Sequence, residues 1–434
     1  MSMFLKKKST TNKRTLNQSI VAWALYDWAN SAFATTVMAG FFPIFFKQYW
    51  SVGVASTEST FHLGVGNALA SLFIVLLAPL LGAIADRGGL RRRFLFLFAA
   101  TGMVATAALY GVEQGEWLMA LVLFVTATIG FMGANIFYDA LLVSVAKKSQ
   151  WDFISALGYA LGYLGGGLLF SVNVAMSLSP ESFGLENATE AVRLSFISVA
   201  VWWAVFSLPL LLLVKETPPV QRVSGWAVVR AGYTQLLDTF HHLRQMRVVV
   251  IFLLAYWFYI DGVDTVIRMA VDYGLSIGLQ QESLITALLI TQFVGLPATL
   301  LFGFLAAKMG AEGLGAKKGI FFALGVYVLA VIGAFFMESS AEFYALAVVI
   351  GLVQGGVQAL SRSLYARMIP PDKSAEFFGF YNMLGKFAAV LGPLLVGVVS
   401  LASGSHRWGM LSVVVLFLIG GWLLAKVDVR QIRS

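Results

Sequence analysis

The stretch GAIADRGGLRRR, residues 82–93, lies between two long apolar segments and combines glycines with one aspartate and four arginines. A helix that crosses a membrane needs about 20 apolar residues, and the segments 61–84 and 93–112 meet that length. Arginines between two such helices favour the cytoplasmic side, and glycine lets helices approach closely. The stretch therefore predicts two membrane helices joined by a short cytoplasmic loop.

The composition of the whole chain agrees with a membrane protein. The 434 residues are 59% hydrophobic and 12% charged, with a mean hydropathy of +0.81, whereas a soluble domain carries about 25% charged residues. The absence of cysteine excludes a disulfide framework and thiol chemistry. The net charge of +8 is spread over short loops rather than gathered in a patch with aromatics, so we expect no nucleic-acid partner.

Apolar segments of spanning length recur along the chain. Strands of a membrane barrel would alternate over about ten residues, and these segments do not, so the predicted fold class is an all-α multi-pass membrane protein embedded in the lipid bilayer. The basic N-terminus precedes a full span rather than a short cleavable signal. The twelve predicted spans are 20–46, 61–84, 93–112, 117–145, 151–177, 193–214, 248–275, 283–307, 317–337, 341–368, 375–401 and 408–426.

The distribution of positive charge predicts the orientation. Of the 30 Lys and Arg residues, 24 fall on one side of the spans, while the other side has only Lys47, Arg193 and Arg407. Positive charge is retained on the cytoplasmic side, so both termini are expected there, in the cytoplasmic (inner) membrane if the protein is bacterial. The remaining three cations, Arg268, Arg362 and Lys386, fall inside spans.

The chain is predicted to divide into two six-helix bundles, 1–214 and 248–434, joined by a cytoplasmic linker, 215–247. Apolar residues recur at helical spacing within the linker, which predicts an amphipathic helix at the membrane interface. GAIADRGG at 82–89 and GFLAAKMG at 303–310 match at an offset of 221 residues. The same offset carries Gly130 onto Gly351 and Gly158 onto Gly379. These matches indicate duplication, and two parallel repeats around a midplane site are typical of transporters.

The pattern Gly-x-x-x-Asp-Arg-x-Gly followed by Arg-Arg resembles the signature loop of the major facilitator superfamily. The resemblance implies two pseudo-symmetric bundles and a gating latch in which an aspartate docks at a helix N-terminus of the other half. An alternative is that Arg91 to Arg93 only fix the topology. The second copy has Ala307 and Lys308 at the equivalent positions, so the latch is expected on one side only. By position the latch comprises Gly82, Asp86, Arg87, Arg91 and Arg92.

Three further stretches carry a narrower resemblance. YDWANSAFATT (26–36), GLVQGGVQALSRSLYARMIP (351–370) and AEFFGFYNMLGKFAAVLGPLL (375–395) are similar to the vacuolar autophagy-related amino-acid effluxers and their bacterial relatives. That group is a branch of the same superfamily. The resemblance implies small, amino-acid-like substrates.

Polar residues inside the spans mark the candidate site. Asp27 lies about 10 Å along its span from the cytoplasmic end, where a lipid-facing charge costs roughly 3 kcal/mol or more, so it must face the bundle interior, water or a partner. Asn30 shares its face. The polar residues fall mainly on the four spans that line the central cavity in the superfamily. The candidates for substrate or ion binding are Asp27, Asn30, Asn135, Tyr138, Asp139, Asp261, Asp264, Arg268, Gln354, Gln358, Arg362, Asn382 and Lys386.

The alternative for these residues is a structural ion pair. Arg268 can pair within its own helix with Asp264 or Asp272, four residues away on either side. Arg362 and Lys386 have no carboxylate at that spacing, so each needs a partner on another helix or the carboxylate of a ligand. Arginine offers a two-pronged donor suited to carboxylates. Asp27, Asp139 and Asp261 are candidates for a proton relay.

Together these patterns predict a secondary transporter that moves a small polar solute by alternating access. A substrate carboxylate would meet Arg362 or Lys386, and an amine would meet Asp27, Asp261 or Asp264; proton coupling is a further hypothesis. Export of drugs or other metabolites is the main alternative, followed by a receptor without transport. The spans hold no cysteine and no deep histidine, so we expect no enzyme activity, metal or cofactor, and we expect a monomer.

Overall fold

The computed structural model describes residues 11–216, 226–243, 246–276, 279–309 and 313–429, and all secondary structure in them is helical. The helix that begins at α1 continues to Trp50 through the short α2 (Phe42–Phe45) and wider π-helical turns on both sides of it. The long helices of the first half are α1 (Thr11–Ala32), α3 (Ser56–Gly88), α4 (Arg91–Ala108), α5 (Trp117–Val145), α6 (Trp151–Leu178) and α7 (Ala188–Leu213).

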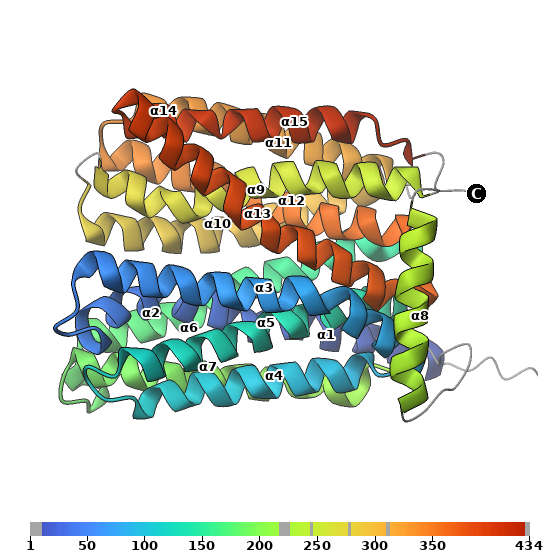
Figure 1. The fold of residues 1–434 in the computed structure, drawn as a ribbon, viewed down its shortest axis with the longest axis horizontal. Coiled ribbons are helices and arrows are strands. Elements are labelled where there is room, and N and C mark those ends of the chain that lie inside the picture. The colour runs from blue at the N-terminus through green and yellow to red at the C-terminus, as the bar shows by residue number, and fades with distance from the viewer. Residues whose placement is uncertain (1–10, 217–225, 244–245, 277–278, 310–312, 430–434) are drawn as a thin grey trace, which may run out of the picture.

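The second half repeats this arrangement after the short helix α8 (Trp226–Leu243). Its helices are α9 (Arg247–Ser276), α10 (Gln281–Lys308), α11 (Leu314–Phe335), α12 (Ser340–Met368), α13 (Ser374–Ser403), α14 (His406–Ser412) and α15 (Val414–Ala425). In Figure 1 the helices of the two halves form two bundles that lie against each other lengthwise. This is the all-α architecture of the major facilitator fold.

Eleven helical stretches among the described residues are long and apolar enough to cross a membrane. They coincide with eleven of the twelve expected spans. The twelfth, 375–401, corresponds to α13, which is 30 residues long and whose later part, Leu391–Ser403, is apolar. The chain is an integral, multi-pass membrane protein.

Helix α8 lies across one end of the two bundles, the end at which α15 also ends (Figure 1). One face of α8 is buried against α3, where Val228 packs beside Gly88 and Gly232 beside Ile84. The opposite face exposes Tyr233 and Leu237. Apolar residues thus lie on both faces of α8, and the location of this helix at the membrane interface stays a prediction. We call this side of the molecule the α8 end.

Two glycines let the bundles touch along α3 and α13. A Cβ atom on Gly82 would lie 2.2 Å from the carbonyl oxygen of Ala375, and one on Gly379 would lie 2.7 Å from that of Ala78. Both obstacles are backbone atoms, which cannot rotate away. The glycines therefore set how closely the bundles approach at the α8 end.

Changing Gly82 to alanine is therefore expected to lower the thermal unfolding temperature in detergent, because overpacking a contact typically costs about 1–3 kcal/mol. Gly397→Ala is the matched control on α13, since a Cβ there would meet no atom within 4 Å. The control should unfold at or slightly above the wild-type temperature. Equal behaviour of the two variants would contradict the role given to Gly82.

Candidate functional site

A cavity of about 300 Å³ lies between the two bundles. Its walls come from α1, α5 and α6 of the first bundle and from α9, α10, α12 and α13 of the second. Ten of the residues that the sequence singled out line it: Asp27, Asn30, Asn135, Tyr138, Asp139, Asp264, Gln354, Gln358, Arg362 and Asn382. Further lining residues that the sequence did not single out include Tyr159, Tyr163, Tyr256, Gln292 and Tyr381.

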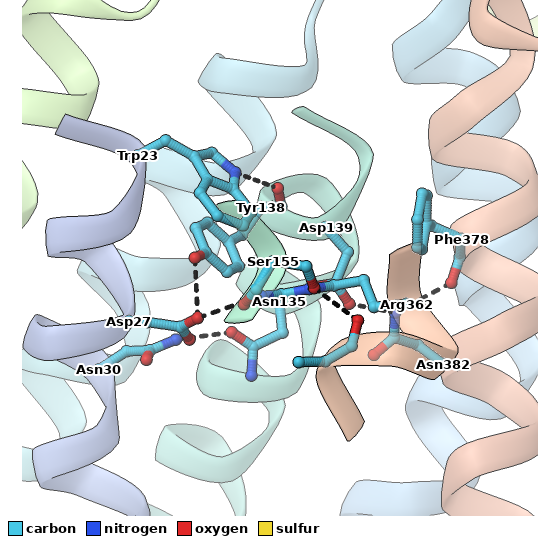
Figure 2. Close-up of polar contacts among 11 residues, drawn as sticks. Trp23, Asp27, Asn30, Asn135, Tyr138, Asp139, Ser155, Arg362, Phe378 and Asn382 are labelled. Carbon is cyan, nitrogen blue, oxygen red and sulfur yellow. Dashed lines mark hydrogen bonds and ion pairs between the residues drawn. The ribbon is translucent and has the colours of Figure 1, made fainter. Parts of the chain in front are cut away.

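Arg362 projects from α12 of the second bundle into the first bundle (Figure 2). One terminal nitrogen donates to Asp139 Oδ1 at 3.0 Å, and the other lies 3.5 Å from Asp27 Oδ2. The same second nitrogen donates to the backbone oxygen of Ser155, and Nε donates to the Ser155 hydroxyl, both at 2.9 Å. The side chain is 1% exposed. One cation is thus held between two carboxylates of the opposite bundle.

Aromatic rings surround this ion cluster. The guanidinium of Arg362 lies 4.3 Å from the ring centre of Tyr159 and 4.9 Å from that of Trp23, distances at which cation–π attraction is effective. Tyr138 stacks on Trp23 and donates its hydroxyl hydrogen to Asp27 Oδ2 at 2.8 Å. These contacts fix the orientation of Asp27 before any ligand arrives.

Amide side chains extend the network along the cavity wall. The amide nitrogen of Asn30 donates to Asn135 Oδ1 at 2.6 Å, and that of Asn382 donates to Asp139 Oδ2 at 3.1 Å (Figure 2). Asn382 belongs to the second bundle, so Asp139 receives contacts from two of its helices. Gly158 leaves room for the cluster, because a Cβ there would lie 2.7 Å from Asp27 Oδ2.

Two sequence-predicted residues, Asp261 and Arg268, have other surroundings. Asp261 is buried outside the described cavity lining, where it accepts the backbone N–H of Gly392 at 3.0 Å. Arg268 is exposed on α9 and is likewise not a described lining residue. The side chains of Lys386 and Asp272 lie outside the described residues. Asp261 and Asp264 are three residues apart and so lie on the same side of α9, yet Asp261 meets the backbone of α13 whereas Asp264 lines the cavity.

At the α8 end, Asp86 meets the N-terminus of α13. Its two carboxylate oxygens accept the backbone N–H groups of Ala375 and Glu376 at 3.1 and 2.9 Å, and Arg91 Nε donates to it at 2.7 Å. A negative charge is stabilised at this end of a helix by the unpaired N–H groups and the helix dipole. The contact joins α3 of the first bundle to α13 of the second.

The arginines after Asp86 differ in their contacts. Arg91 also donates to the backbone oxygens of Pro371 and Asp372, at 3.3 and 3.2 Å. Arg92 donates to the backbone oxygen of Leu211, whereas Arg87 Nε has no hydrogen-bond partner among the described residues.

Glu216 begins the linker and caps α4. Its carboxylate accepts the backbone N–H groups of Arg91 and Arg92 at 3.0 and 2.7 Å, a contact that the sequence did not suggest. Burial raises the pKa of Glu216 above its ordinary value, although these two N–H donors oppose the shift. The linker is thereby attached to the same loop that carries the Asp86 contact.

A second tie between the bundles was missed by sequence reasoning. Arg367 of α12 pairs with Asp152 of α6 at 2.9 Å, with both side chains fully buried. Ser363 donates to the same carboxylate at 2.6 Å, and Arg367 donates to the backbone oxygen of Lys148 at 2.6 Å. The charge count places Arg367 among the 24 cations of one side, whereas in the structure its side chain is buried between the bundles. The sequence signal for this pair was Asp152, an acidic residue in the first turn of the predicted span 151–177.

No cluster of three or more His, Asp or Glu side chains that could hold a metal ion occurs in the described part of the chain. Charges, amides and aromatic rings line the cavity, and Arg362 with its two carboxylate partners joins the two bundles beside it.

Comparison with known families identifies the chain. Residues 15–151 and 144–434 match the family described as vacuole effluxer Atg22 like. The chain belongs to this family. A relative in Bacillus subtilis (strain 168), an uncharacterized MFS-type transporter named YxiO, is 37% identical over 408 residues, covering 94% of both chains. Autophagy-related protein 22 of Saccharomyces cerevisiae is 22% identical over 506 residues, covering 98% of this chain and 95% of the relative.

Solved structures share the family's fold. The human organic anion transporter MFSD10 superposes with a TM-score of 0.70 at 15% identity, covering 96% of this chain and all of that one. The proton:xylose symporter XylE superposes with a TM-score of 0.69 at 14% identity, covering 95% of each chain. At these identities the likeness shows the major facilitator fold alone. The chain is thus an MFS-type transporter of the Atg22 branch.

Proposed function

We propose that this protein is a proton-coupled secondary transporter that moves a small, amino-acid-like solute across the membrane by alternating access. The observation that carries the proposal is Arg362, which crosses from the second bundle to carboxylates of the first beside a cavity. In this architecture the two bundles move against each other. An ion pair between the bundles can therefore take part in that movement, whereas an ion pair within one bundle would only stabilise it.

The ties at the α8 end support the same mechanism. Two contacts join the bundles at this end: Asp86 accepts hydrogen bonds from the N-terminus of α13, and Asp152 forms an ion pair with Arg367. This end is therefore closed in the conformation observed. Rocking of the bundles would break these contacts and open the cavity to the α8 side. From the excess of positive charge we assign the α8 end to the cytoplasm. The cavity is complete within one chain, so we propose a monomer as the functional unit.

The cavity supports a small substrate with polar groups. A space of about 300 Å³ is at the small end of ligand pockets, and its wall offers carboxylates, side-chain amides and tyrosine hydroxyls. These groups suit an amino acid better than an extended apolar compound. The resemblance to amino-acid effluxers points the same way. Export of drugs or other metabolites remains the second candidate.

The test is transport by purified protein in proteoliposomes. Vesicles loaded with an unlabelled mixture of amino acids are expected to take up at least one radiolabelled amino acid faster than protein-free vesicles, with an imposed pH gradient changing the rate. Sugars and cationic drugs form the comparison panel. Uptake of drugs but not amino acids would favour the second candidate, and binding without uptake would favour a receptor.

A further inference from the structure

We propose that the substrate of this transporter carries a protonated amine, and that this ammonium group and a proton occupy Asp27 alternately, so that the two are exchanged across the membrane. The inference rests on the proposed function. It names the substrate class and the residue at which coupling occurs.

The Arg362 side chain is not free to bind a carboxylate of the substrate. Arg362 is the only cation among the cavity-lining residues whose side chains are described. Its Nε and both terminal nitrogens already contact Ser155, Asp139 and Asp27, and 1% of the side chain is exposed. A substrate carboxylate would have to displace a buried, charged partner to reach it, which is strongly unfavourable. Arg362 therefore holds the bundles together rather than receiving an anion.

Asp27, by contrast, has an oxygen to offer. Its contacts with Tyr138 and Arg362 both go to Oδ2. The side chain lines the cavity and remains 11% exposed, which leaves Oδ1 as the atom that a ligand can reach. An ammonium group hydrogen-bonds a carboxylate strongly in such a low-dielectric site. The existing contacts hold the carboxylate in place and leave one face for the incoming donor.

The rest of the cavity favours a cation as well. Carboxylates of Asp27, Asp139 and Asp264 line it together with five tyrosines, Tyr138, Tyr159, Tyr163, Tyr256 and Tyr381. Aromatic faces attract ammonium groups, by more when water is excluded.

The substrate ammonium and the proton exclude each other because both neutralise the same carboxylate, that of Asp27. The titratable or charged groups facing Asp27 are Tyr26 on its own helix, Tyr138 and Asp139 on α5, Tyr159 and Tyr163 on α6, and Arg362 on α12. Helix α7 also packs against α1, where the uncharged side chain of Trp202 stacks on Trp28. Protonated Asp27 is neutral and cannot pair with an ammonium group. The ammonium therefore binds as the Asp27 proton leaves, and a proton must return for the amine to be released.

The experiment measures binding and proton release in detergent with phenylalanine, phenylethylamine and N-acetylphenylalanine. The tyrosine-rich wall suits the aromatic ring of these probes, and acetylation removes the ammonium charge while adding an acetyl group. Phenylalanine and phenylethylamine are expected to bind with release of a proton into a weakly buffered indicator solution, and N-acetylphenylalanine is expected not to bind. In the range where Asp27 is protonated, the affinity for the amines should fall by up to about tenfold for each unit decrease in pH.

Variants separate Asp27 from other acids. Asp27→Asn should abolish proton release and flatten the pH dependence, Asp27→Glu should retain exchange with a shifted pH profile, and Asp261→Asn should behave as wild type because Asp261 is buried outside the described lining. Binding of N-acetylphenylalanine as tight as that of phenylalanine, or proton release that persists in Asp27→Asn, would overturn the inference while leaving a transporter. Failure of the wild type to bind or transport any amino acid or amine would instead overturn the proposed function.

Discussion

Replacing Arg362 with alanine is expected to abolish transport and to lower the free energy of unfolding by about 3–5 kcal/mol, the range found when one partner of a buried ion pair is removed. The change leaves Asp27 and Asp139 as uncompensated buried carboxylates and removes the donors to Ser155. Uptake in proteoliposomes and thermal unfolding in detergent measure the two effects.

Two controls separate the loss of the mechanism from the loss of stability. Arg362→Lys keeps the charge but not the planar fork, so it should recover part of the stability and little transport. Combining Arg362→Ala with Asp27→Asn and Asp139→Asn removes all three charges and should restore much of the stability without transport. The exposed Arg268→Ala should leave both near wild type. Wild-type uptake by Arg362→Ala would refute the proposed coupling between the bundles.

Replacing Asp86 with alanine is expected to open the α8 end. Hydrogen bonds to a charged group contribute about 1.5–3 kcal/mol each, and Asp86 receives two from the N-terminus of α13 and one from Arg91. Losing them from the closed conformation shifts the equilibrium toward the conformation in which the bundles separate there. A loss of about 3 kcal/mol changes the population ratio by more than a hundredfold.

The chain is well suited to measure this shift because it has no native cysteine. Spin labels at Lys147→Cys and Asp372→Cys, exposed positions at the α8 end of the two bundles, should report longer distances in Asp86→Ala than in the wild type. Asp86→Asn, which keeps an oxygen acceptor but no charge, should fall between them. Lys308→Ala, at the position that the repeat relates to Arg87, should not alter the distances. Unchanged distances in Asp86→Ala would contradict the latch.

The sequence was sufficient to predict the membrane class and most of the polar cavity. Apolar length placed the spans, because lipid allows no backbone group to remain unpaired. The cost of a buried charge identified Asp27, Asp139 and Arg362 as interior residues. The absence of a carboxylate one turn from Arg362 required either a partner on another helix or a ligand carboxylate, and in the structure Asp139 on α5 lies 3.0 Å away.

What the sequence could not predict were contacts that depend on how helices rotate and cross. Helical periodicity gives the depth of a residue and its face on its own helix, so Asp261 and Asp264 looked equivalent, although one accepts a hydrogen bond from Gly392 and the other lines the cavity. The pairing of Asp152 with Arg367 and the capping of α4 by Glu216 join segments far apart in the chain.

The sequence by itself therefore determined that this protein crosses the membrane many times with charges that must avoid lipid, and it predicted two related halves. Only the tertiary structure decided which charges meet. The physical reason is that the energy of a buried charge depends on the partner within a few ångströms, and close packing of helices at residues such as Gly82 and Gly158 sets that distance.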